Sequence, residues 1–381
     1  MTTRRWGRAP AAGGPARHAT GTTGARRPAL ALGVLVAGLL ALRALAPFLA
    51  PPASVRVPSV PMAVQPTRPA PLTEATGTRL YLAGDDGLLR VDIDRRSVRL
   101  VALPGRVAEI GGGLVGRDGV VVAVRGGFAY AAADRPDRPA VPLGPASYAV
   151  ASASPGRVWL VEETGDPNRW FRAREVELGG SREQLGAGTL PLGQRPVAGA
   201  PGGLLVQEVG AVGGLAVWDQ RTGRLERRLA TGATVTAVAA RGPAVAWVEG
   251  SALHLGDLAS GRHRVVPPPP GTDGFAAPGA FSPDGRLLAA VTSVGFSTRP
   301  ALALVDTTRA SAVQVAGSEG ALSDRCSPCL AWTPAGDWVF FSRLGPGFGI
   351  GAYRLGQDRA VTVPVDLPFS FPPSFAATRP E

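Results

Sequence analysis

From Arg79 onward, short apolar runs alternate with turn-forming residues, and no long segment shows the 3.6-residue period of an amphipathic helix. The clearest unit is residues 280–291, with the sequence AFSPDGRLLAAV. It predicts a strand, a tight turn at Pro283-Asp284-Gly285 and a second strand, because proline fixes φ and glycine adopts turn conformations that other residues resist. The pattern therefore predicts an all-β fold built from hairpins.

Weaker copies of this unit recur at residues 153–160, 200–206 and 331–341. Glycines mark the predicted corners at intervals of 37 to 51 residues, close to the length of a propeller blade. These corner glycines are Gly119, Gly156, Gly203, Gly242, Gly285 and Gly336. Since one such unit cannot bury both of its faces alone, the repeats predict a closed array, a β-propeller.

A truncated unit precedes the six complete ones. Residues 80–83, 87–92 and 97–101 supply three strands but no inner first strand. The C-terminal residues 369–376 are the candidate for the missing strand, which would close the ring by pairing the chain ends. We expect seven four-stranded blades over residues 78–376, with six or eight as the alternatives, and a tail over residues 377–381.

Residues 281–288, FSPDGRLL, resemble the signature of WD40-like (TolB-type) propeller repeats. The resemblance implies that Phe281 and the residues after Gly285 pack between blades, while Pro283 to Gly285 form the hairpin. It implies a scaffold rather than a particular reaction.

The N-terminus carries the only hydrophobic segment of membrane type, residues 28–50. It is apolar from residue 29 to residue 42, is interrupted by Arg43, and then continues apolar. We interpret it as one transmembrane helix that anchors the chain, with a cleaved signal peptide as the alternative. Six Arg precede it, which predicts a cytoplasmic N-terminus and a single-pass cell-membrane protein with the propeller outside.

The flanks of this segment predict no packed structure. Residues 1–27 are expected to be a disordered, basic, cytoplasmic tail, and residues 51–77 a Pro-rich linker. Residues 1–78 hold nine Arg against one Glu, a charge of +8 out of the total of +11. The rest of the chain is therefore close to neutral for its size, which argues against a nucleic-acid partner.

Few residues suggest chemistry. Beyond the N-terminal region the histidines are His254 and His263, with no further metal ligands nearby in sequence and no Gly-x-Ser-x-Gly nucleophile elbow. Residues 111–113 and 347–351 are Gly-rich and are interpreted as loops or corners, because neither opens a helix that could cradle phosphate. We assign no catalytic, cofactor-binding or metal-binding residue and no cofactor.

The two cysteines, Cys326 and Cys329, are three residues apart in a domain that we place in an oxidising compartment. A local disulfide is the leading interpretation. Trp159, Trp247, Trp332 and Trp338 lie near the predicted corners, where packing between blades is favoured over a ligand cage.

These features favour a non-enzymatic binding or scaffold module for a protein, peptide or glycan at the cell envelope, with a monomeric ectodomain. The longer insertions, residues 163–174 and 345–351, are the candidate binding loops. A propeller hydrolase or lactonase with its site at the mouth of the central channel is the alternative, and a purely structural spacer is a third class.

Overall fold

The computed structural model describes residues 70–84, 87–104, 110–117, 120–133, 139–166, 169–178, 184–190, 193–208, 214–231, 235–293, 299–321, 330–344, 348–367 and 374–378. Every regular element in these ranges is a β-strand. Among them there is no helix of the length and apolarity that a membrane crossing requires. The predicted anchor, residues 28–50, lies outside the described residues, as do Cys326 and Cys329.

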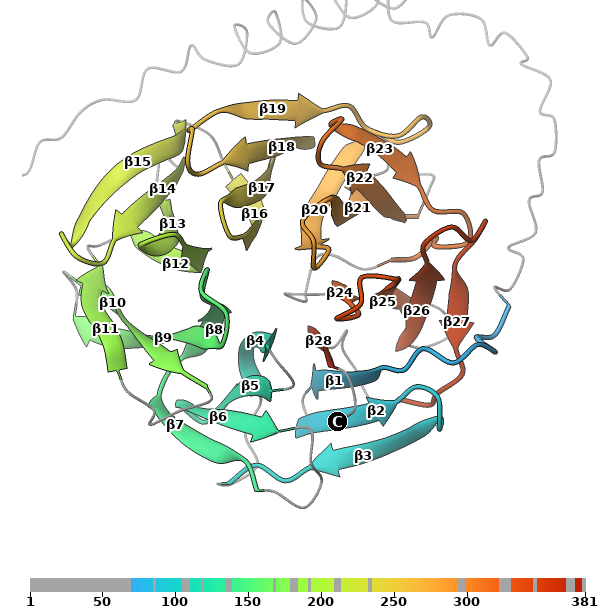
Figure 1. Ribbon diagram of the computed structural model, residues 1–381, viewed down its shortest axis with the longest axis horizontal. Helices are drawn as coiled ribbons and strands as arrows, with labels where there is room; N and C mark the ends of the chain where they lie inside the picture. Colours follow the sequence, from blue (N-terminus) through green and yellow to red (C-terminus); the bar gives the residue numbers. More distant parts are fainter. Residues whose placement is uncertain are drawn as a thin grey trace, which may run out of the picture. The chain divides into compact units, whose positions relative to one another are not determined.

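The strands form seven four-stranded antiparallel sheets arranged as the blades of a propeller (Figure 1). From the channel outward, blade 1 is β28 (Ser374–Thr378), β1 (Arg79–Gly84), β2 (Gly87–Asp92) and β3 (Ser97–Val101); blade 2 is β4 (Ile110–Arg117), β5 (Val120–Arg125), β6 (Phe128–Ala133) and β7 (Val141–Pro145); blade 3 is β8 (Tyr148–Ala151), β9 (Arg157–Asp166), β10 (Arg169–Glu177) and β11 (Gln184–Leu190).

Blade 4 is β12 (Gln194–Ala200), β13 (Gly203–Glu208), β14 (Gly214–Asp219) and β15 (Arg224–Thr231); blade 5 is β16 (Val235–Arg241), β17 (Ala244–Glu249), β18 (Ala252–Asp257) and β19 (His263–Val266); blade 6 is β20 (Gly274–Phe281), β21 (Leu287–Ser293), β22 (Leu302–Asp306) and β23 (Ser311–Gln314); blade 7 is β24 (Leu330–Trp332), β25 (Trp338–Leu344), β26 (Phe348–Arg354) and β27 (Val361–Val363). The prediction of seven blades is confirmed.

The C-terminal strand closes the ring. β28 pairs antiparallel with β1, placing Phe375 opposite Leu82, and it contacts the inner strands β24 and β4 of the two adjacent blades. The prediction that a C-terminal strand closes the ring is therefore confirmed. β28 ends at Thr378, two residues beyond the predicted range of 369–376, and residues 369–373 lie outside the described residues.

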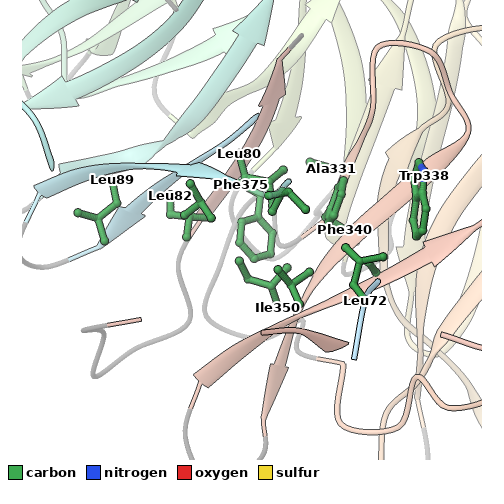
Figure 2. Close-up of a cluster of buried hydrophobic side chains, with 13 residues drawn as sticks. Leu72, Leu80, Leu82, Leu89, Ala331, Trp338, Phe340, Ile350 and Phe375 are labelled. Carbon is green, nitrogen blue, oxygen red and sulfur yellow. The ribbon is translucent and has the colours of Figure 1, made fainter. Parts of the chain in front are cut away.

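Apolar side chains fill each seam between blades. In the seam between blades 7 and 1, Phe375 meets Leu80 and Leu82 from blade 1 and Phe340 from blade 7 (Figure 2). All four side chains are fully buried. Burying such a side chain is worth roughly 1.5–3 kcal/mol, so the closing strand contributes packing as well as backbone pairing.

The 282–286 corner repeats as a hydrogen-bonded unit. The Ser282 N–H donates to the Leu287 carbonyl (2.8 Å), and the Leu287 N–H donates to the Ser282 hydroxyl (3.0 Å). Thr333 makes the same two bonds with Trp338, at 2.9 and 3.1 Å. Phe281 and Leu288 pack between blades 5 and 6, as the resemblance implied.

The corner glycines have left-handed backbones, with φ of 67° at Gly156, 55° at Gly242, 74° at Gly285 and 77° at Gly336. In blade 4 the prediction of Gly203 was wrong by one position. Gly202 has the positive φ of 81°, whereas Gly203 begins β13 and lies so close to the Trp218 carbonyl that a side chain would collide with it. Gly119 lies outside the described residues.

Residues 70–78 form a strap over the outer edge of blade 7. The Leu72 N–H donates to the Thr362 carbonyl (2.8 Å), and the Thr362 N–H donates to the Ala70 carbonyl (2.9 Å), which forms a parallel β-bridge between Pro71 and Thr362 of β27. Leu72 is buried in the seam between blades 7 and 1, and Glu74 pairs with Arg354 at 2.6 Å. The strap therefore belongs to the packed ring, although it precedes the expected boundary at residue 78.

The topology gives the ring two distinct faces. The corner face carries the connections from the first to the second strand of each blade, such as residues 282–286. In blade 1 that connection is replaced by the end of β28 and the start of β1, so both ends of the propeller lie on this face. The opposite face, the loop face, carries the connections from the second to the third strand and those between blades.

We predict that Phe375→Ala lowers the free energy of unfolding by about 3–5 kcal/mol, since it leaves a cavity where the ring closes. Val313→Ala is the control, because Val313 lies on an outer strand and is 69% exposed; its expected effect is within about 0.5 kcal/mol. Urea unfolding followed by tryptophan fluorescence measures both. Equal stability of the two variants would contradict the assigned role of β28.

Candidate functional site

The longest hairpin among the described residues, β9–β10, stands on the loop face of blade 3. β8 pairs with β9 only from Val158 to Val161, so Glu163 and the residues after it extend beyond the inner strand. The prediction of a loop at residues 163–174 was wrong in form, because most of this segment is a two-stranded extension. Residues 348–351 of the second predicted loop likewise lie in β26, and residues 345–347 are outside the described part of the chain.

The side of this hairpin that faces blade 2 is charged. Glu162 and Arg172 are cross-strand partners 3.8 Å apart, and both are well exposed. Arg174 lies deeper and donates to the backbone carbonyls of Leu143 (3.3 Å) and Pro145 (3.1 Å) on β7. Burial lowers the pKa of the Arg174 guanidinium, and the Glu162 carboxylate opposes that effect.

Glycine makes this contact with β7 possible. Gly144 has a φ of 125°, and a Cβ there would collide with the guanidinium of Arg174. The blade 2–blade 3 seam is therefore closed at the loop face by a cation that is held by backbone carbonyls.

An exposed aromatic ring lies on the other side of β7. Phe128 follows the tight turn at Gly126 and Gly127, is paired with Pro145 across the strands, and is 38% exposed. We call Phe128, Glu162, Arg172 and Arg174 the β7 rim, because they flank the loop-face end of this short strand.

Tyr148 begins β8, the inner strand that pairs with this hairpin. Its hydroxyl donates to the Pro196 carbonyl of blade 4 at 3.0 Å, and its ring packs edge-on against Phe171 with centroids 6.1 Å apart. Arg195 lies over the ring at 5.7 Å. Burial raises the pKa of the Tyr148 phenol far above its ordinary value, and Arg195 acts in the opposite direction. Tyr148 is thus a neutral hydrogen-bond donor that joins blades 3 and 4.

The histidines lie away from the channel. His254 is on β18 and His263 on β19, the third and fourth strands of blade 5. Among the residues that the structure describes, no three His, Cys, Asp or Glu side chains converge as metal ligands.

The acidic residues at or near the ends of β2 have local roles where the structure describes them. The Asp92 carboxylate accepts the Arg95 N–H, and Asp94 accepts the N–H groups of Thr76 and Gly77, so both hold turns or the strap. Asp85 and Asp86 are not among the described residues.

The Gly-rich runs are not loops, contrary to expectation. Residues 111–113 lie in β4, and Gly351 lies in β26, where a Cβ would collide with the ring of Phe341. The four predicted packing tryptophans, Trp159, Trp247, Trp332 and Trp338, are all buried in seams between blades.

Sequence reasoning missed Phe128 and the contact of Arg174 with β7, although Arg174 ends the candidate loop at residues 163–174. The dipeptide Gly126-Gly127 before an aromatic residue was a usable signal for an exposed turn. Nothing in the sequence indicated the reach of Arg174 to β7, since that contact joins residues about thirty positions apart.

Neither a family model nor a curated protein matches this sequence. Solved structures do match. A proposed 6-phosphogluconolactonase of Bacteroides fragilis is 13% identical with a TM-score of 0.51, covering 80% of this chain and 99% of its own. A puromycin-hydrolysing peptidase of Mycobacterium tuberculosis is also 13% identical with a TM-score of 0.51, covering 78% of this chain and 53% of its own.

TolB of Acinetobacter baumannii is 14% identical with a TM-score of 0.45, covering 80% of this chain and 86% of its own. At 13% identity the first two matches show the fold alone, a β-propeller. Because this fold carries both binding proteins and enzymes, the role of the chain has to be argued from its own residues.

We predict a pH dependence from Tyr148. Its folded pKa lies above its unfolded value of about 10, so its contribution to stability is fully present below about pH 10 and is lost as the pH rises further. Tyr148→Phe should lose less stability than the wild type between about pH 9 and pH 11 in urea unfolding. Equal losses in the two proteins would show that Tyr148 is not the buried donor described above.

Proposed function

We propose that this protein is a membrane-anchored, extracytoplasmic propeller that binds a protein, peptide or glycan partner on its loop face, without catalysis. The observation that carries the proposal is the contrast between the two faces. One face holds both ends of the propeller and the hydrogen-bonded corners, and the other carries a projecting charged hairpin beside an exposed aromatic ring.

The corner face is largely committed to holding the ring together. Its hydroxyl side chains bond their own turns, as at Ser282 and Thr333, and the Ser282 hydroxyl also donates to Asp284 at 2.6 Å. The strap and its pair between Glu74 and Arg354 lie there as well. Groups that are engaged in this way are less available to a partner.

The β7 rim offers the residue types that dominate recognition. Aromatic and Arg side chains are enriched among the residues that contribute most to interfaces, and the exposed Phe128 and Arg172 supply both types. A hairpin on a rigid ring also loses little conformational entropy on binding. These features favour a protein or peptide partner over a glycan.

The proposed anchor, residues 28–50, supports the choice of face. The described part of the chain starts at Ala70 on the corner face, and we propose that the anchor is joined to the propeller there. The loop face is opposite, and a partner can approach it without passing the tether. We further propose that the N-terminus is cytoplasmic, that the ectodomain is monomeric, and that Cys326 and Cys329 are bridged.

A hydrolase or lactonase with its site at the channel mouth is the alternative. It would have to use polar groups near that mouth, such as Glu163 and Arg195. Turnover of lactones or esters by the purified chain, lost in Arg195→Ala, would favour this alternative.

We predict that shortening the hairpin abolishes partner capture. Replacing residues 164–170 by Asn-Gly leaves Glu163 and Phe171 as the closing pair of a two-residue turn and preserves the packing on Tyr148. Crosslinking from intact membranes should recover a partner with the wild type and lose it with this variant and with Phe128→Ala. Arg309→Glu on the corner face is the control and should retain the partner. Recovery that is unchanged by both loop-face variants would refute the assignment of the face.

Topology is a separate prediction. A reporter that is active only outside the cytoplasm, fused after residue 78, should be active, because six Arg precede the apolar segment. The same reporter fused after residue 27 should be inactive. The reverse pattern would overturn the outward placement of the propeller.

A further inference from the structure

Three aromatic rings gather at the outer end of the seam between blades 4 and 5. The indole of Trp247 on β17 stacks on the imidazole of His254 on β18, with centroids 5.0 Å apart and planes 10° apart. His263 on β19 lies 5.4 Å from Trp247 and 5.5 Å from His254. Because Gly256 has no side chain, the indole has room to lie across β18, where a Cβ would approach it to 2.8 Å.

The two imidazoles differ in exposure. The side chain of His254 is 13% exposed, whereas His263 is open to solvent on the outermost strand. Trp247 beneath them is 1% exposed and packs with Val217 and Leu229 of blade 4. The imidazoles therefore separate the indole from solvent at the edge of the ring.

The cluster holds polar groups that are buried without partners. Among the described residues, neither Nδ1 of His254 nor Nε1 of Trp247 has a hydrogen-bond partner. The charged or titratable groups that act on His254 are Glu249 of β17, whose carboxylate is 3.7 Å from Nε2, and His263 of β19. The blade 4 residues of the same cluster are apolar.

We propose that His254 and His263 form a pH-sensitive cover over Trp247, which opens the outer end of the blade 4–blade 5 seam when the surroundings become acidic. The imidazoles of His254 and His263 pack against the indole. A proton on His254 places a charge inside this stack, beside His263, and leaves a buried N–H donor without an acceptor.

The exposed imidazole, that of His263, is the one that can move. His263 has solvent beside it and can leave the indole, whereas His254 is stacked between strands. Burial lowers the pKa of His254, and a charge on His263 lowers it further, while Glu249 opposes both. The cover therefore opens when His254 takes up a proton. An exposed Trp beside His and Glu would give blade 5 a contact surface that exists only under acidic conditions.

Collisional quenching of tryptophan tests the cover. The Trp247 signal is obtained as the wild-type emission minus that of Trp247→Phe, and acrylamide quenching is compared at about pH 7.5 and about pH 5, on either side of the ordinary imidazole pKa. We expect Trp247 to be shielded at the higher pH and accessible at the lower. Trp159→Phe is the matched control, because Trp159 is equally buried in another seam and packs edge-on against Trp218. Its difference signal should stay shielded throughout.

A second measurement does not depend on the folding of a Trp variant. The chain has three His, so three imidazole resonances can be followed by NMR, and His254→Gln assigns one of them. We expect the His254 resonance to titrate below the ordinary range, and His263→Gln to shift its midpoint upward. Trp247 that stays shielded at both pH values, or a His254 midpoint at the ordinary imidazole value that His263→Gln leaves unchanged, would overturn the proposal.

Discussion

The pairing of β28 with β1 is the interaction on which the rest of the ring depends. The N-terminal side of the propeller supplies only three strands of blade 1, and without β28 the inner edge of β1 and the side chains of two seams would be open to water. Phe375 fills this junction from the C-terminal strand (Figure 2). The closure joins residues almost three hundred positions apart, so it has a loop-closure entropy cost. The backbone pairing and packing of β28 oppose that cost and stabilise the ring.

This closure also determines where function can lie. Because the last inner strand takes the place of a corner in blade 1, both ends of the propeller come out on the corner face. The strap adds a second fastening on the same side, through Leu72 and Glu74. The loop face carries none of these constraints. Its hairpins can differ in length from blade to blade while the seams stay intact, and β9–β10 is the one that extends furthest beyond its inner strand.

Much of the ring could be read from the sequence, because its strands are short, apolar and bounded by strong turn formers. The outer strands β2 and β3 begin and end at the predicted residues, and the Pro283-Asp284-Gly285 corner forms the expected hairpin. The predictions failed where a strand lacks this contrast between apolar residues and the turn-forming residues at its ends. Residues 163–174 resembled a loop because charged residues such as Arg172 and Arg174 lie among them, whereas the glycines of β4 and β26 suggested loops or corners. In β26, glycine is needed because a neighbouring ring occupies the space of a side chain.

The candidate site was harder to predict than the fold. The β7 rim and the His254–Trp247 stack are contacts between strands or blades, and their residues follow no repeat. The sequence shows Arg174 only as one more charged residue, because its role depends on the contact with β7. The role of His263 depends likewise on the indole of Trp247, which has room to lie across β18 because Gly256 has no side chain. Residue type and spacing therefore predicted the blades of the propeller, whereas the candidate site depends on which strands and blades lie side by side.

Native-state hydrogen exchange of the β28 amides tests the central claim most directly. If the closing strand holds the ring together, these amides exchange only when the whole domain unfolds, with the same denaturant dependence as those of the buried strand β17. Exchange of β28 through a local opening that leaves β17 protected would show that the ring stands without its C-terminal strand, and would contradict the account.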